Sequence, residues 1–202
     1  MFSRHDLVWL TPAGWDAAPA LPEWRVRDWP AVVRRHEAGV DPAAICLGIP
    51  LPDRQRLALV VSPAQIARSS PPLALADAIG AAPPQWLAGL VALQRAAAAL
   101  DVRVYGSLAM ASITGLPYLG ATSDIDLLLR PATRAELQAG LALLEEHAQV
   151  LPLDGEIVFP SGEAVAWKEW LAARRDQARV LVKSLTAVRL ADPAQLFHLL
   201  PA

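Results

Sequence analysis

Residues 123–129 read Ser-Asp-Ile-Asp-Leu-Leu-Leu, and this stretch decides the fold prediction for the chain. Asp124 and Asp126 stand two positions apart, with apolar residues between and after them. Side chains two apart on a β-strand leave on the same face, so the two carboxylates would point to one side. A run this apolar is typical of a strand inside a sheet. We therefore predict a strand over Asp124–Leu129 with two acids on one face.

Two acids in an interior strand predict a bound cation, because buried carboxylates without a positive charge are costly. Mg²⁺ prefers oxygen ligands and is commonly shared between carboxylates and substrate phosphates. We therefore expect Asp124 and Asp126 to be catalytic residues that bind Mg²⁺ as the cofactor. An isolated Asp-x-Asp motif also occurs in solvated turns and in the metal sites of sugar-nucleotide glycosyltransferases. The apolar residues around this one disfavour a solvated turn.

A second motif lies upstream, where residues 102–107 read Val-Arg-Val-Tyr-Gly-Ser. This pattern predicts a short strand, a turn at Gly106 and a helix over 107–113. Glycine lets the backbone approach a ligand closely, and the first amides of a helix attract anions. We predict that Gly106, Ser107 and Ser123 bind substrate phosphates. For both serines a helix cap or a turn is the competing structural role.

A third carboxylate is expected from residues 154–158, which read Asp-Gly-Glu-Ile-Val. Such a group would act as a metal ligand or as a base for the incoming hydroxyl. Asp154 and Glu156 would share one face of a strand, and we rank Asp154 first while leaving both open. Lys183 is a lone cation in the apolar run 180–183 and is predicted to bind substrate phosphates. Several arginines, Arg56 among them, would hold donor phosphates or meet an acidic carrier protein, or form a solvated face.

The chain divides into two predicted units. Residues 69–84 concentrate Pro, Ser, Gly and Ala and are typical of a connection, so we place the boundary at 82. Residues 1–82 would be an N-terminal mixed domain for the donor or the carrier protein, with strands at 6–10, 45–50 and 57–61 and a short helix at 30–37. In residues 83–202 helices and strands alternate, which predicts an α/β fold with helices packed on a mixed sheet.

Composition excludes several classes of protein. The chain has 202 residues, of which 54% are hydrophobic, so it can bury a core. A net charge of −2 argues against the broad basic field that binds long nucleic acids. The single cysteine, Cys46, allows no internal disulfide, and the first residues lack the apolar stretch of a signal peptide. We therefore expect a cytoplasmic protein that contacts neither nucleic acid nor membrane.

Six stretches together resemble a known family over nearly the whole chain. The chain is similar to the malonate decarboxylase holo-acyl-carrier-protein synthases, which are phosphoribosyl-dephospho-CoA transferases of the nucleotidyltransferase superfamily. The resemblance implies a polymerase-beta-like nucleotidyltransferase domain. One departure is the interval of sixteen residues between Ser107 and Asp124, which is longer than usual in the superfamily. The stretches that carry the resemblance are 4–9, 105–118, 123–128, 154–157, 164–169 and 182–184.

The resemblance implies a reaction and two partners. The donor would be triphosphoribosyl-dephospho-CoA, and the acceptor a serine of the malonate decarboxylase acyl carrier protein. Transfer would attach the 2′-(5″-phosphoribosyl)-3′-dephospho-CoA prosthetic group and release pyrophosphate. In the superfamily the acids of the Asp-x-Asp pair bind metal, a role that falls on Asp124 and Asp126. The alternatives are a nucleotidyltransferase with another acceptor (the citrate lyase carrier protein, a small molecule or a tRNA) and a non-catalytic module that binds a carrier protein.

Overall fold

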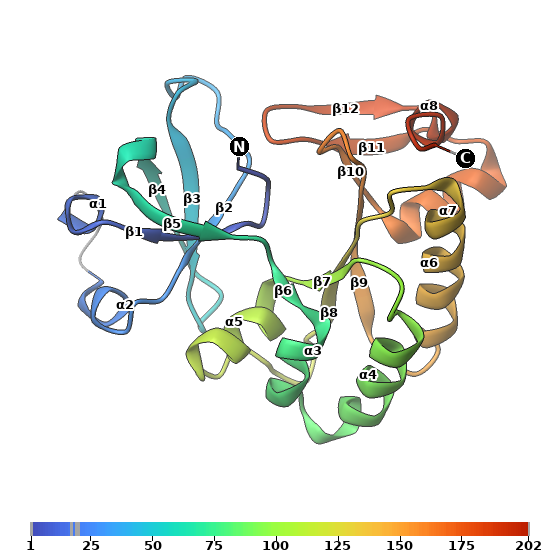
Figure 1. Cartoon of the computed structure of the whole chain (residues 1–202), viewed down its shortest axis with the longest axis horizontal. Coiled ribbons are helices and arrows are strands. Elements are labelled where there is room, and N and C mark those ends of the chain that lie inside the picture. Colours follow the sequence, from blue (N-terminus) through green and yellow to red (C-terminus); the bar gives the residue numbers. More distant parts are fainter. Residues whose placement is uncertain (1, 17, 19–20, 202) are drawn as a thin grey trace.

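The computed structural model describes residues 2–16, 18 and 21–201, and it contains two β-sheets (Figure 1). The first sheet has five antiparallel strands in the order β4-β3-β2-β1-β5. Two short helices, α1 (Pro12–Asp16) and α2 (Pro22–Val26), lie between β1 and β2 in the sequence. The strands are β1 (Leu7–Leu10), β2 (Ala31–Val33), β3 (Ile45–Pro50), β4 (Arg56–Val61) and β5 (Ile66–Ser70).

The second sheet has seven strands in the order β12-β11-β10-β9-β8-β7-β6. Only β8 and β9 pair in parallel; the other neighbours are antiparallel. This mixed sheet with its helices confirms the predicted α/β class. The strands are β6 (Leu73–Ala74), β7 (Val102–Val104), β8 (Ile125–Leu129), β9 (Leu153–Val158), β10 (Ala164–Ala166), β11 (Val180–Lys183) and β12 (Val188–Ala191).

Helices cover the face of the second sheet that points away from the first sheet (Figure 1). Alternation along β8 directs Ile125, Leu127 and Leu129 into the core beneath α4 and α6. Asp126 and Leu128 leave on the opposite face, toward the first sheet. The helices of this half are α3 (Leu75–Ala78), α4 (Pro84–Ala96), α5 (Gly106–Thr114), α6 (Arg134–His147), α7 (Trp167–Asp176) and α8 (Pro193–Phe197).

The predicted strands of the first half are confirmed within one residue, but the predicted helix over 30–37 is wrong. Residues 31–33 form β2, and Val32 pairs with Leu7 of β1 on one side and Gly48 of β3 on the other. Val32 and Val33 are β-branched residues, which favour strands. Backbone hydrogen bonds from two neighbours therefore decide the conformation of this segment.

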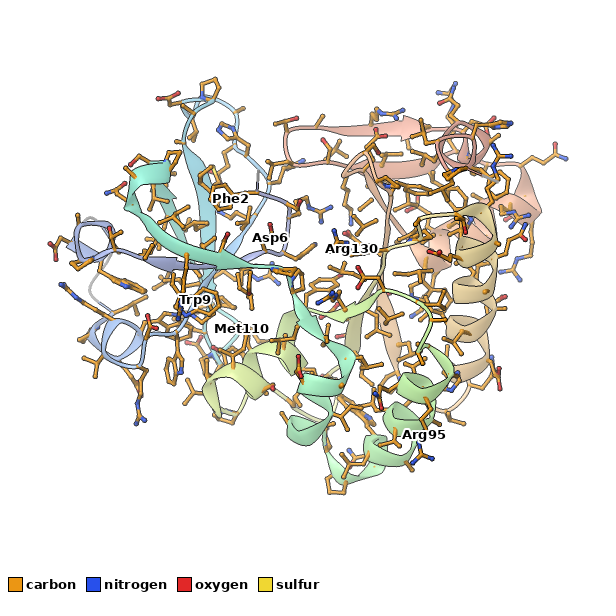
Figure 2. The ribbon with its side chains drawn as sticks, in the orientation of Figure 1. Phe2, Asp6, Trp9, Arg95, Met110 and Arg130 are labelled. Atoms are coloured by element: carbon orange, nitrogen blue, oxygen red, sulfur yellow. The ribbon has the colours of Figure 1, made fainter. Side chains whose placement is uncertain are left out.

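The chain passes from the first sheet to the second between Ser70 and Leu73, ahead of the boundary placed at 82. Leu73 pairs with Val104, and Leu75 and Ala78 are buried in the core of the second sheet. Residues 69–84 have the composition of a loop. Composition does not show that part of this segment pairs with a strand about thirty residues later. The two sheets also share α5, since Met110 (labelled in Figure 2) belongs to the core of the first sheet.

None of the described helices combines the length and the apolar character needed to cross a lipid bilayer. Helix α4 ends at Ala96, well short of a membrane span. Its buried residues, Trp86, Leu90 and Leu93, face the core of the second sheet.

Candidate active site

The parallel pairing of β8 and β9 places Asp126 directly opposite Asp154. Neighbouring strands lie about 4.8 Å apart, so the two carboxylates leave the same face side by side. Asp124 is exposed and precedes β8, which begins at Ile125 rather than at Asp124 as predicted. All three acids nevertheless belong to one site, because the charges of Asp124 and Asp154 both act on Asp126.

The site strongly perturbs the protonation of Asp126. Burial raises its pKa to about 7, with further contributions from the nearby charges of Asp124 and Asp154. No three His, Cys, Asp or Glu side chains among the described residues already form a metal-binding group. The three carboxylates still fit Mg²⁺ chemically, since they bring oxygen donors and several negative charges to one face of the sheet.

Gly106 brings the start of α5 against Asp126. The residue has φ +66°, and a Cβ atom there would overlap Oδ2 of Asp126. The Tyr105 N–H donates a hydrogen bond of 3.1 Å to the Asp126 carbonyl, which holds the turn beside β8. Ser107 lies half-buried in the first turn of α5. The predicted glycine-serine turn therefore lies next to the acids despite the long interval in sequence.

A second glycine sets the spacing between the two central strands. Gly155 has φ +130°, and a Cβ atom at this position would overlap the backbone of Leu127, its partner across the parallel pair. Only glycine permits this approach without displacing β8. Asp154 and Glu156 flank it on the same face, so the Asp-Gly-Glu motif sets both the strand spacing and the positions of its acids.

The two candidates for the third carboxylate have different surroundings. The side chain of Asp154 is 45% exposed, opposite Asp126, and its Oδ1 lies 3.7 Å from Lys168 Nζ. Glu156 is 5% exposed, and its Oε1 lies 3.0 Å from Lys183 Nζ. Asp154, which the sequence ranks first, is thus the accessible carboxylate opposite Asp126. Lys183, which the sequence predicts to bind substrate phosphates, is paired with Glu156.

The remaining predicted site residue, Ser123, closes a turn. Its Oγ accepts a hydrogen bond of 2.9 Å from the Gly120 N–H, directly before Asp124. The loop that contains it rests on the first sheet, because the Tyr118 hydroxyl donates to the Pro50 carbonyl at 2.8 Å. Ser123 thus lies in a turn directly before Asp124, at the rim of the site.

Arginines of the β3–β4 hairpin reach this rim from the first sheet. Arg54 Nη2 donates to Thr122 Oγ1 at 3.3 Å. Arg56, the cross-strand partner of Pro50, is exposed, and its charge partly offsets the raised pKa of Asp126, which burial chiefly causes. Arg56 therefore acts on the acids through its charge, and Arg54 contacts the loop that precedes Asp124.

Arg4, His5 and Lys168 are site residues that sequence reasoning did not assign. Arg4 Nη2 lies 3.1 Å from Oε2 of Glu156, and the His5 ring packs on Tyr105 with centroids 4.1 Å apart. Their signal in the sequence is their place in two of the stretches that resemble a family, 4–9 and 164–169.

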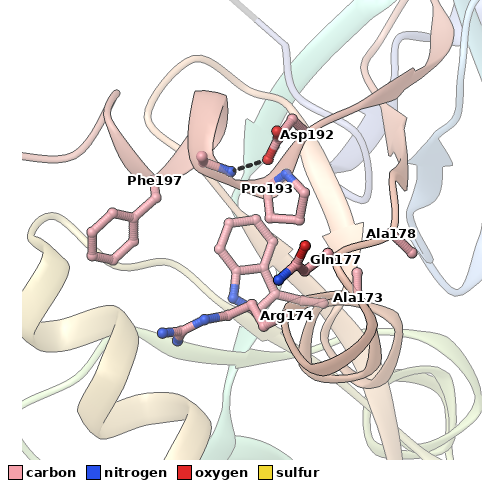
Figure 3. Close-up of a pocket in the computed structure, with 9 residues that line it drawn as sticks. Ala173, Arg174, Gln177, Ala178, Asp192, Pro193 and Phe197 are labelled. Carbon is pink, nitrogen blue, oxygen red and sulfur yellow. Dashed lines mark hydrogen bonds between the residues drawn. The ribbon is translucent and has the colours of Figure 1, made fainter.

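A cavity of about 500 Å³ between α7 and α8 lies apart from these residues (Figure 3). Arg174, Gln177 and Phe197 line it, and the Asp192 side chain beside it caps α8 by accepting from the Ala194 N–H at 2.8 Å. None of the predicted site residues lines this cavity.

Both halves of the chain match known family models. Residues 74–194 match the phosphoribosyl-dephospho-CoA transferase MdcG C-terminal domain, and residues 3–72 match the N-terminal domain of the same family. The chain belongs to this family. The two matched regions meet where the chain changes sheets, and the family is one of transferases, so the predicted enzyme class is confirmed.

Curated members of the family are similar over almost their whole length. A phosphoribosyl-dephospho-CoA transferase of Xanthomonas campestris pv. campestris is 42% identical, with 98% of this chain and 97% of the relative covered. One from Bradyrhizobium diazoefficiens is 36% identical (95% and 91% covered), and one from Klebsiella pneumoniae is 34% identical (92% and 92% covered). No solved structure matches the chain significantly.

Proposed function

We propose that this chain transfers 2′-(5″-phosphoribosyl)-3′-dephospho-CoA from its triphosphoribosyl precursor to a serine of the malonate decarboxylase acyl carrier protein, releasing pyrophosphate. The observation that carries the proposal is the pairing of Asp126 with Asp154 beside the Gly106 turn. Paired carboxylates next to a helix N-terminus supply the two halves of a nucleotidyl-transfer site, one for cations and one for phosphates. The family's transferase names support the donor class.

In this proposal the aspartates and the start of α5 have separate roles. Asp124, Asp126 and Asp154 would hold Mg²⁺, which when bound supplies Lewis acidity and neutralises phosphate charge. The first amides of α5 and Ser107 would hold the phosphates that leave as pyrophosphate. The carrier serine Oγ forms a new bond to the donor phosphorus as the bond to pyrophosphate breaks. Asp154, the more exposed carboxylate of the central pair, accepts the serine proton.

The first sheet contributes to donor binding in this proposal. Arg56 faces the acids from β4, and Arg54 holds the loop before Asp124 through Thr122. Guanidinium groups suit phosphate oxygens because they donate in a planar fork. The donor would therefore lie between the two sheets, with its phosphates contacted from both.

The test is transfer to purified apo carrier proteins, followed by intact-mass measurement. The triphosphoribosyl donor, Mg²⁺ and the malonate decarboxylase carrier should give a mass gain equal to the prosthetic group, with one pyrophosphate released per transfer. The citrate lyase carrier serves as the alternative acceptor, and an Asp126→Asn variant as the inactive control. Transfer only to the citrate lyase carrier would overturn the acceptor assignment. Tight carrier binding without pyrophosphate release would identify a non-catalytic module.

A further inference from the structure

Glu156 occupies the position next to the paired aspartates on the same face of the second sheet. It pairs with Leu128 across the parallel strands, one step beyond Asp126 and Asp154. Only 5% of Glu156 is exposed, although the carboxylates of the adjacent pair are accessible. A buried carboxylate is stable only with charged or hydrogen-bonding partners. The identity of those partners therefore decides what Glu156 does.

The partners come from both ends of the chain. Arg4 Nη2 lies 3.2 Å from Oε1 and 3.1 Å from Oε2 of Glu156, and His5 Nε2 lies 3.5 Å from Oε2. Lys183 Nζ of β11 completes the group at 3.0 Å from Oε1. Arg4 is itself mostly buried, with 15% of its side chain exposed. These contacts cross from the first sheet to the second over 152 residues of sequence.

The segment that carries Arg4 and His5 is anchored in the first sheet. The His5 N–H donates to the Val33 carbonyl, and the Val33 N–H donates to the Asp6 carbonyl, both at 2.8 Å. His5 adopts φ 72°, a left-handed conformation that is uncommon for a residue with a side chain and persists where surroundings hold it. The conformation directs both side chains of the Arg4-His5 pair onto the second sheet.

His5 also connects Glu156 with the other side of the site. Its ring packs on Tyr105 at 4.1 Å between centroids, with an interplanar angle of 44°. Tyr105 immediately precedes the Gly106 turn and is bonded to the backbone of Asp126. The Arg4-His5 pair, which is anchored in the first sheet, thus contacts both the strand that bears Asp154 and the turn that would hold phosphates.

We propose that Glu156 is a positioning residue, which joins the Arg4-His5 segment to β9 and so fixes Asp154 and the Gly106 turn relative to each other. It is not a metal ligand or a base in this assignment. The proposal rests on the proposed function for the reaction that it supports. The contact between the two sheets is a property of the fold and can be measured without substrate.

The first experiment measures hydrogen exchange in the substrate-free protein. Glu156→Gln and Arg4→Gln should each raise amide exchange in segments 2–8, 103–107 and 153–158 by about tenfold, because each removes the buried charge pair that joins the two sheets. Arg25→Gln, which removes an exposed ion pair with Asp16, is the matched control and should leave these segments unchanged. Unchanged exchange in segment 2–8 of both Glu156→Gln and Arg4→Gln would overturn the proposal. This readout is independent of whether the proposed reaction occurs.

The second experiment separates positioning from metal binding. Both variants should lower kcat about tenfold or more, while the donor KM and the Mg²⁺ concentration for half-maximal rate stay within about twofold. Arg4→Lys should restore part of the rate. The Arg4→Gln, Glu156→Gln double variant should be no slower than the slower single variant, since both substitutions remove the same Arg4–Glu156 interaction. A large rise in the Mg²⁺ requirement of Glu156→Gln alone would make Glu156 a ligand and overturn the assignment. If Glu156→Gln fails to fold, Arg4→Gln still tests the proposal.

Discussion

Gly106 lies against Asp126 so closely that a Cβ atom on the glycine would overlap Oδ2 of the carboxylate. The start of α5 and the acidic strand β8 are therefore fitted to each other at one point. A ligand of the Asp126 carboxylate would therefore lie next to the first amides of α5. This contact explains why the glycine-serine motif and the Asp-x-Asp motif form a single site although sixteen residues separate Ser107 from Asp124.

Replacing this glycine should disable the site. Gly106→Ala is expected to displace the Asp126 carboxylate and to lower kcat about 100-fold, the size of effect that small misplacements of catalytic groups produce. Gly115→Ala is the matched control, because Gly115 has a similar φ of +71° with no atom within 4 Å of its added Cβ. It should cost about 1 kcal/mol of stability and keep near-normal kcat. Steady-state kinetics and thermal unfolding of both variants check this, and equal loss of activity in the two would contradict it.

Gly155→Ala should instead act on the fold. Its Cβ would overlap the Leu127 backbone between the central strands, so we expect a loss of roughly 3 kcal/mol or more in the free energy of unfolding. Gly162→Ala, at φ +80° with no neighbour within 4 Å, should lose about 1 kcal/mol. Urea denaturation of the two variants measures the difference. A Gly155→Ala protein as stable as Gly162→Ala would show that β8 and β9 can separate without cost.

Mg²⁺ should stabilise the protein through the aspartates. Adding excess Mg²⁺ to the wild type should raise Tm by roughly 2–4 °C, since an ion that binds only the folded state shifts unfolding by mass action. Asp126→Asn and Asp154→Asn should lose this shift and at least about 1,000-fold in transfer rate, as expected when charge stabilisation at the reacting phosphate is removed. Without Mg²⁺, Asp126→Asn should be no less stable than the wild type, because a half-buried charge between Asp124 and Asp154 is removed. An exposed acid, Asp176, supplies the control variant Asp176→Asn, which should retain the Mg²⁺ shift.

Arg56 should contribute to donor affinity. Arg56→Ala is expected to raise the donor KM about tenfold or more with little change in stability, the usual effect of losing one charge-assisted hydrogen bond. Arg68→Ala is the comparison, because Arg68 pairs with Asp28 at 2.7 Å and lies 4.0 Å over the Trp9 ring, contacts within the first half of the chain. KM measurements at saturating carrier protein distinguish the two. An unchanged donor KM in Arg56→Ala would show that Arg56 of the first sheet does not contribute to donor binding.

Local patterns account for the features that the sequence predicted well. Strand alternation and helix periodicity extend over a few residues, so β1, β3, β4 and the helices of the second half follow from composition and spacing. The position of Asp126 on an interior strand follows from its apolar neighbours in the same way. The helix predicted over 30–37 is wrong because pairing with two distant strands outweighs local preference.

The amino-acid sequence by itself determined the α/β class, the family, and the separate Asp-x-Asp and glycine-serine motifs, because each is carried by short stretches of the chain. The tertiary structure decided which acid stands opposite Asp126 and what Glu156 contacts. Those relationships depend on the parallel register of β8 with β9 and on a contact between Arg4 and Glu156 across 152 residues. Spacing within the chain carries no record of such pairings. The first arises when β8 and β9 pair within the second sheet, and the second when the two sheets pack together.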